Sequence, residues 1–316
     1  MNIAVQKSSP AAVSPSPSPS PSPSPSPSRR NMFAGAASVA ASVGAVSALA
    51  STAQAQASRT AGHKPRGLTD ADIFNFALNL EFLETEYYLR GLTGQGLSQS
   101  DTGSTSGEVT GGRKVQFRTP MIERFMQNIG RNETRHVRFL RSTLESSAIA
   151  RPRIDFTAGF AAVAQAAGLG TDFDPFADEV SFMLGSYLFE DVGVTAYKGA
   201  APFIRNKDYL QAAAGIHAME AYHVGVVRSS LYRLGPAVRD QARKISDLRD
   251  LVDGPLDLDQ PIELNGRANI VPTDSGGVTF SRTPQEVLNI VYGQAGAGVM
   301  SGGFFPDGVN GKVQVT

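Results

Sequence analysis

Cysteine is absent from the 316-residue chain, so no disulfide framework, thiolate ligand or thiol nucleophile is available. An excess of one charge is also missing, because 29 lysine and arginine residues balance 29 aspartate and glutamate residues. A balanced chain offers no broad basic field, and we expect no nucleic-acid partner. Histidine is scarce, with four in the chain. Any bound metal ion must therefore be held by oxygen atoms and these few imidazoles.

Residues 1–57 are typical of a targeting segment. Serine and proline alternate over 14–28, which favours an extended chain without core-forming side chains. Arg29 and Arg30 come next, then a weakly apolar run that ends in small residues, as in a cleavable signal. The paired arginines resemble a twin-arginine export signal. We expect cleavage near Ala55 or Ala57, a periplasmic or extracellular location, and no stable membrane span afterwards. A disordered basic tail and an uncleaved anchor are the alternatives.

The remaining chain divides into a short flexible linker at 58–67, a helical bundle at 68–240 and an extension at 241–316. Start signals and apolar spacings of three and four predict four helices. We expect them at 69–90, at 119–146, from Asp174 to about Tyr197, and at 206–234. The extension is rich in aspartate, proline and glycine, and we expect it to be mostly irregular with a short helix near 284–292. The predicted fold class is all-α, a four-helix bundle.

Each predicted helix carries acidic or histidine side chains on the stripe that should face the core. Such stripes are normally apolar, and an unpaired buried carboxylate costs several kcal/mol. Two of the helices carry a glutamate followed three residues later by a histidine, so both side chains of each pair share one helix face. These candidate ligands are Glu81, Glu133, His136, Glu190, Glu220 and His223.

Two divalent metal ions would neutralise the four inward carboxylates. One glutamate from each of two helices, with a glutamate and histidine pair from each of the other two, is the ligand set of di-iron and di-manganese bundles. The sequence therefore predicts a dinuclear centre, with iron favoured and manganese as the alternative. An internal repeat supports it, because Glu81 precedes Tyr88 by seven residues and Glu190 precedes Tyr197 by seven. The first and second helix pairs then correspond as two copies of one hairpin.

Several neighbouring residues have open roles. Glu84 could replace Glu81 as the ligand, accept a hydrogen bond beside the metals, or pair with Arg90. His217 is an alternate ligand, although a core histidine is the more common case. Tyr88 and Tyr197 are core aromatics that could also bond the carboxylates. Glu86 is expected to be a solvated surface charge.

Particular segments make the chain resemble the ferritin-like domain family that includes desiccation-related proteins. In the bundle they are NLEFLE at 79–84, NETRH at 132–136, VGVTAY at 192–197 and AMEAYH at 218–223. In the extension they are FSRTPQEVLNIVY at 280–292, GFFP at 303–306 and GVNG at 308–311. The resemblance runs from about Leu68 to the C-terminus. It implies a ferritin-like bundle and a link to stress or drying tolerance, but no agreed reaction.

Two functions follow as expectations. The first is a metal-dependent oxidoreductase, ferroxidase-like or catalase-like, in which dioxygen or peroxide meets the open coordination positions of the metal pair. The second is a non-enzymatic protein that protects surfaces during drying, with the metal structural or absent. A homo-oligomer is compatible with both.

Overall fold

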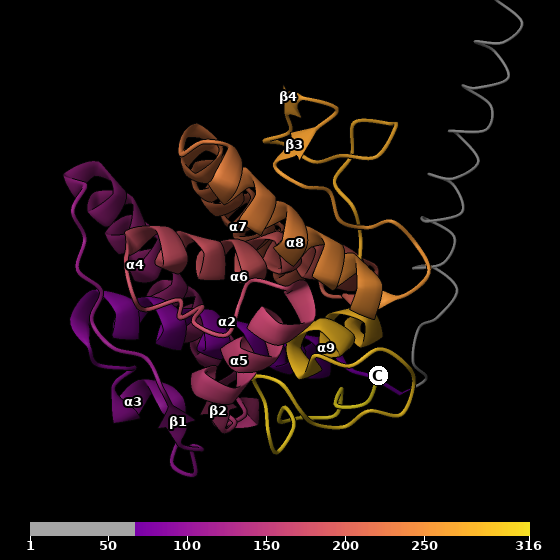
Figure 1. Ribbon diagram of the computed structural model, residues 1–316. Coiled ribbons are helices and arrows are strands. Elements are labelled where there is room, and N and C mark those ends of the chain that lie inside the picture. The colour runs from indigo at the N-terminus through magenta and orange to yellow at the C-terminus, as the bar shows by residue number, and fades with distance from the viewer. Residues whose placement is uncertain (1–66) are drawn as a thin grey trace, which may run out of the picture. The chain divides into compact units, whose positions relative to one another are not determined.

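The computed structural model describes residues 67–316, and helices dominate this part of the chain (Figure 1). The expected targeting segment lies outside the described residues, as does almost all of the expected linker. The helices are α2 Asp70–Thr93, α3 Gln99–Thr102, α4 Pro120–Leu144, α5 Phe156–Ala167, α6 Glu179–Ala200, α7 Lys207–Arg233, α8 Pro236–Asp253 and α9 Pro284–Tyr292. Four two-residue strands pair in parallel (β1 Val109–Thr110 with β2 Ile154–Asp155) and antiparallel (β3 Glu263–Leu264 with β4 Arg267–Ala268).

Four long helices form the bundle, which confirms the predicted all-α class. Helix α2 packs mainly against α4, and α6 mainly against α7, so the two hairpins expected from the internal repeat are present. Both α2 and α6 are buried along most of their length, whereas α4 and α7 bury one stripe each. A continuous apolar core runs through the bundle and reaches α5, α8, α9 and the C-terminal residues.

Local capping explains where the helices begin. Thr69 and Asp72 form the expected capping box at the start of α2. Pro120 occupies the first turn of α4 after Thr119, also as expected. The expected start of the third helix near Asp174 is wrong, because α6 begins at Glu179. The Asp178 side chain accepts the amide hydrogens of Val180 and Ser181 there, so capping falls four residues later.

Three helices were missing from the sequence-based prediction, namely the four-residue α3, α5 and α8. Helix α5 is apolar on most sides, so no clear helical stripe separates it from a loop. Helix α8 extends into the region expected to be irregular. It begins with Pro236 after Gly235, a start signal visible in the sequence, and buries Ala242, Ile245 and Leu248. The short helix expected at 284–292 is confirmed as α9.

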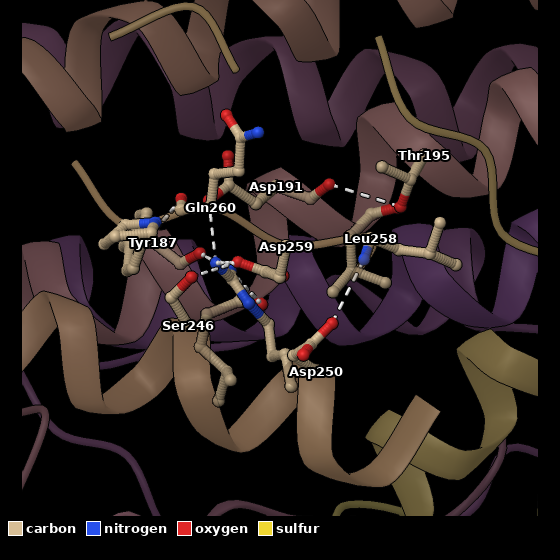
Figure 2. A network of polar contacts seen from close by, with 12 residues as sticks. Tyr187, Asp191, Thr195, Ser246, Asp250, Leu258, Asp259 and Gln260 are labelled. Carbon is tan, nitrogen blue, oxygen red and sulfur yellow. Dashed lines mark hydrogen bonds and ion pairs between the residues drawn. The ribbon is translucent and has the colours of Figure 1, made fainter. Parts of the chain in front are cut away.

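Buried ion pairs attach the extension to the bundle. Asp259 of the extension accepts hydrogen bonds from Ser246 and Arg249 on α8 and from Arg282. Asp191 on α6 accepts from Arg249 and from Arg228 on α7. Figure 2 shows Asp191, Ser246 and Asp259 turned toward the same buried space. The network crosslinks α6, α7, α8 and the extension, because each arginine bonds groups from more than one of them.

None of the helices described between residues 67 and 316 is long and apolar enough to span a membrane.

Candidate metal centre

The four long helices bring six acidic and histidine side chains to one interior position. Helical spacing places Glu133 and His136 on one face of α4, and Glu220 and His223 on one face of α7. Helices α2 and α6 contribute Glu81 and Glu190. The four carboxylates are completely buried and the two histidines nearly so, as the inward stripes predict.

The six side chains form two groups that share two members. Each group has ligand atoms that all lie within 4.8 Å of one another. The shared carboxylates are those of Glu133 and Glu220, and each group is completed by one further glutamate and one histidine. The groups are Glu81, Glu133, His136 and Glu220, and Glu133, Glu190, Glu220 and His223.

Short contacts surround the two histidine Nδ1 atoms. His136 Nδ1 lies 3.2 Å from Glu81 and 3.5 Å from both Glu133 and Glu220. His223 Nδ1 lies 3.0 Å from Glu133 and 3.2 Å from Glu190. The two imidazole centroids are 6.0 Å apart. One Nδ1 therefore belongs to each group.

The shared carboxylates indicate cation binding most directly. All four oxygens of Glu133 and Glu220 are buried and accept no hydrogen bond of good geometry, although three of them lie 3.0–3.5 Å from a histidine Nδ1 atom. Buried carboxylates with so few partners are rare in folded proteins, because burial removes their water. Two divalent ions between the two groups would give these oxygens partners and balance four negative charges. The donor set of carboxylate oxygen and imidazole nitrogen suits iron and manganese.

Protons partly neutralise the site in the metal-free protein. Burial raises the pKa of Glu81 to about 7, and burial with the charge of Glu133 raises that of Glu220 well above its usual value. Burial would raise the pKa of Glu133 too, but His136 and His223 hold it below its usual range. Burial opposes protonation of both histidines, but the neighbouring carboxylates outweigh it. Glu81 and Glu133 raise the pKa of His136 to about 11. Glu190 and Glu133 raise the pKa of His223 to about 10. The cluster attracts positive charge.

Hydrogen bonds donated by two tyrosines connect the two hairpins. Tyr88 on α2 donates its hydroxyl hydrogen to Glu190 on α6 at 2.5 Å, and Tyr197 on α6 donates to Glu81 on α2. Burial, with the neighbouring carboxylate adding to it, raises the pKa of both hydroxyls well above the usual value. Both tyrosines therefore stay neutral donors. The seven-residue spacing seen in the sequence corresponds to this exchange of hydrogen bonds.

Glu84 lies outside both groups, so the geometry favours Glu81 as the ligand from α2. Its carboxylate is nonetheless buried beside them, and burial together with the charges of Glu133 and Glu190 raises its pKa well above the usual value. His217 on α7 also lies outside the groups.

The expectation for Glu86 is wrong. Its side chain is completely buried and pairs with Arg90 and Arg151. Arg151 lies in the loop between α4 and α5, a partner that helical spacing alone cannot reveal.

Two residues beside the site were not expected. Asn132 Nδ2 lies 3.2 Å from His223 Nε2, the ring nitrogen that faces away from the carboxylates. In the sequence, the position of Asn132 directly before Glu133 could have indicated that it lies beside the site. Gly193 lies against Glu220, and a Cβ atom there would collide with Glu220 Oε2. The sequence could have indicated this glycine, because Gly193 follows Glu190 by three residues and the corresponding position of the first hairpin is Glu84.

Known proteins match the region that holds this site. The model of the ferritin-like domain family matches residues 69–233, which include all six side chains. The chain belongs to the ferritin-like domain family. Among curated proteins, it is 28% identical over 265 residues to the ferritin-like catalase Nec2 of Nesocodon mauritianus, covering 77% of this chain and 84% of that protein.

A second relative is the desiccation-related protein PCC13-62 of Craterostigma plantagineum. The identity is 29% over 242 residues, covering 70% of this chain and 76% of the relative. Both matches exceed the length of the family domain, so the likeness takes in residues beyond it. The expected resemblance to the desiccation-related branch is confirmed. No solved structure gives a significant match.

Proposed function

We propose that this ferritin-like protein binds two divalent ions, of iron or manganese, and disproportionates hydrogen peroxide into water and dioxygen. The observation that carries the proposal is the set of four buried, unbonded oxygens of Glu133 and Glu220 between two histidines. The name of the catalase relative supports peroxide as the substrate. When bound, the metal pair would supply two-electron redox chemistry that no side chain of this chain can supply.

The protein's own residues have definable tasks in this proposal. Glu133 and Glu220 would be shared by both ions, and Glu81 with His136 and Glu190 with His223 would complete one ion each. Tyr88 and Tyr197 would orient the outer carboxylates through their hydrogen bonds. The apolar core around the cluster would keep bulk water away.

Metal content and peroxide loss test the proposal together. We expect about two metal ions per chain in the parent and almost none in a Glu133→Ala, Glu220→Ala double variant, because two shared ligands are removed. The parent should release one dioxygen for every two peroxide molecules consumed. Glu123→Ala is the matched control on α4, because Glu123 lies outside both groups and bonds Gln127. A metal-free parent would overturn the site, and a loaded parent without peroxide loss would overturn the reaction.

The second candidate is a stress-protective protein whose metals only hold the core together. The name of the desiccation-related relative favours it. This candidate also predicts about two metal ions per chain, but it predicts no peroxide loss. Measuring metal content and peroxide loss on the same samples therefore separates the two candidate functions.

We further propose export by the twin-arginine route, on the basis of Arg29 and Arg30. Expression of the parent and of an Arg29→Lys, Arg30→Lys variant, followed by fractionation and mass measurement, tests it. The parent should appear outside the cytoplasm with residues near 1–57 removed, and the variant should stay inside unprocessed. A parent retained at full length inside the cell would contradict export.

A further inference from the structure

A narrow cavity lies between α2, α6, α9 and the C-terminal segment. Its volume is about 10 Å³, which is close to the space of one water molecule. Apolar side chains such as Leu83, Val192 and Phe304 line it, and Glu84 is its single ionisable wall residue. A space of this size and polarity admits one small molecule at a time and holds no water network, because a water needs two to four polar partners.

A second cavity lies next to the first and shares part of its wall. A pocket of about 30 Å³ lies between α5, α8 and α9, and it shares Leu188, Ile290 and Phe304 with the inner cavity. The outer pocket is also lined by Ala162 and Gly293, which are exposed to solvent. The three shared side chains therefore separate a solvent-facing pocket from the inner cavity.

The inner end of the cavity touches the metal cluster. Glu84 and Gly193 form this end. Glu84 Oε1 lies 3.4 Å from the point where a Cβ atom of Gly193 would stand, and Glu220 Oε2 lies closer still to the same point. Because Gly193 has no Cβ atom, the carboxylate of Glu220 can pack against α6 at the same end of the cavity as Glu84.

This end also breaks the correspondence between the hairpins. Position 84 on α2 corresponds to position 193 on α6, since each follows its outer glutamate by three residues. One copy carries a carboxylate and the other carries no side chain. The ligands themselves correspond throughout, so the asymmetry concerns the space beside them. A structural site alone has no need of a fifth buried carboxylate beside the four in the two groups, because burial penalises it.

We propose that the gap between Glu84 and Gly193 is the port through which a peroxide-sized molecule reaches the metal pair, with Glu84 as the side chain that receives it. The inference deepens the proposed function and rests on it. Glu84 contacts the entering molecule by hydrogen bonding, Gly193 leaves the space, and Phe304 narrows the approach from the outer pocket. The C-terminal extension thereby forms part of the route.

Azide, a small metal-binding anion, tests the port without turnover. Azide is mixed with the metal-loaded full-length protein in a stopped-flow instrument, and the rate of its absorption change is recorded with the metal content of each sample. Glu84→Leu should keep both metal ions and slow azide association by about tenfold or more, since the receiving group is gone. Phe304→Leu should raise the rate severalfold, because a smaller side chain joins the two pockets.

The opposite face of the cluster provides the control. The His136 side chain is 10% exposed, so entry beside the histidines is the competing route. Phe139→Leu alters that face one turn after His136, at an exposed side chain outside both groups, and should leave the azide rate at the parent value. Glu84→Gln keeps a hydrogen-bonding group, so its azide association rate should lie between those of the parent and Glu84→Leu. This variant also tests the port if Glu84→Leu does not fold.

Particular outcomes overturn the port. Equal azide rates in the parent and both Glu84 variants would do so, as would a rate that rises in Phe139→Leu and not in Phe304→Leu. Metal loss in Glu84→Gln would make Glu84 a ligand instead. A parent that shows the expected azide pattern but consumes no peroxide would contradict the proposed reaction and leave the port standing. A parent that consumes peroxide, with azide rates that do not change in the Glu84 variants, would support the proposed reaction and contradict the port.

Discussion

Tyr88 and Tyr197 are matched donors at the residue scale, each holding the outer glutamate of the other hairpin. Replacing either by phenylalanine keeps the ring in the core but leaves a buried carboxylate oxygen without its partner. We expect Tyr88→Phe and Tyr197→Phe each to weaken metal affinity by about 10- to 100-fold, the usual effect of losing a group that orients a ligand. Titration with manganese or ferrous iron under anaerobic conditions measures this.

Tyr222→Phe is the matched control for the tyrosine variants. Tyr222 precedes His223 on α7 but its side chain is 71% exposed, so the hydroxyl is not needed inside the site. Its variant should bind metal like the parent. Equal affinity in all three variants would show that the tyrosines only fill space.

The unusual pKa values predict how pH changes the stability of the metal-free protein. The Glu81 carboxyl, with a folded pKa of about 7, stabilises the fold when protonated, and this contribution is lost between pH 4.5 and 7. The raised pKa values of His136 and His223 stabilise the fold below pH 6.5, and this contribution is lost as pH rises toward about 10 and 11. The metal-free protein should therefore melt at lower temperature as pH rises from 5 to 9.

Bound metal should reverse this trend. Metal binding needs deprotonated ligands, so affinity and stabilisation both grow with pH. Thermal melting followed by circular dichroism, with and without saturating metal, gives the two curves. A metal-free protein whose melting temperature is constant or rises over this range would contradict the proton-filled site.

At the scale of the element, α6 depends on Gly193. A methyl group there would press on Glu220 Oε2, the end of a flexible side chain, so the helix survives while the ligand moves. We expect Gly193→Ala to fold normally and to lower metal affinity on the order of 10-fold or more. Calorimetric metal titration and melting of the metal-free protein separate these effects.

Gly215→Ala on α7 is the corresponding control. A Cβ atom at Gly215 meets nothing within 4 Å and the position is exposed. This variant should keep its metal affinity and gain about 0.5–1 kcal/mol of stability from helix propensity. Metal loss in both glycine variants would indicate a general effect of helix rigidity.

For the molecule as a whole, Asp259 belongs to the network that links the extension to the bundle, because its partner Arg249 also bonds Asp191 on α6. It accepts from Ser246, Arg249 and Arg282 in a fully buried position, and the arginine charges hold its pKa below the usual range in spite of burial. Asp259→Ala would leave two buried guanidinium groups short of a partner. We expect a loss of about 3–5 kcal/mol in the free energy of unfolding, measured by urea denaturation.

Asp247→Ala controls for removal of an acidic residue that also pairs with an arginine. Asp247 pairs with Arg243 on the exposed side of α8, where an ion pair contributes roughly 0–1 kcal/mol. A loss at Asp259 no larger than that at Asp247 would mean that the buried ion pairs of Asp259 add nothing to the stability of the protein.

The sequence by itself determined the four bundle helices and the side chains on their inner faces. Helical periodicity is local, so a spacing of three places Glu133 with His136 and Glu220 with His223 on common faces whatever the rest of the chain does. The same logic found the capping box at Thr69 and the short α9. That these side chains bind metal remains a prediction.

Only the tertiary structure decided between residues that share a face. Glu81 and Glu84 lie one turn apart on α2, and periodicity cannot say which one reaches the shared carboxylates. The burial of Glu86 and the crossed tyrosine bonds likewise depend on helices distant in sequence. Pairing across such distances is fixed by how the elements pack together, which no local pattern encodes. The choice between Glu81 and Glu84, the cavity beside them and the link to the extension therefore became visible only in three dimensions.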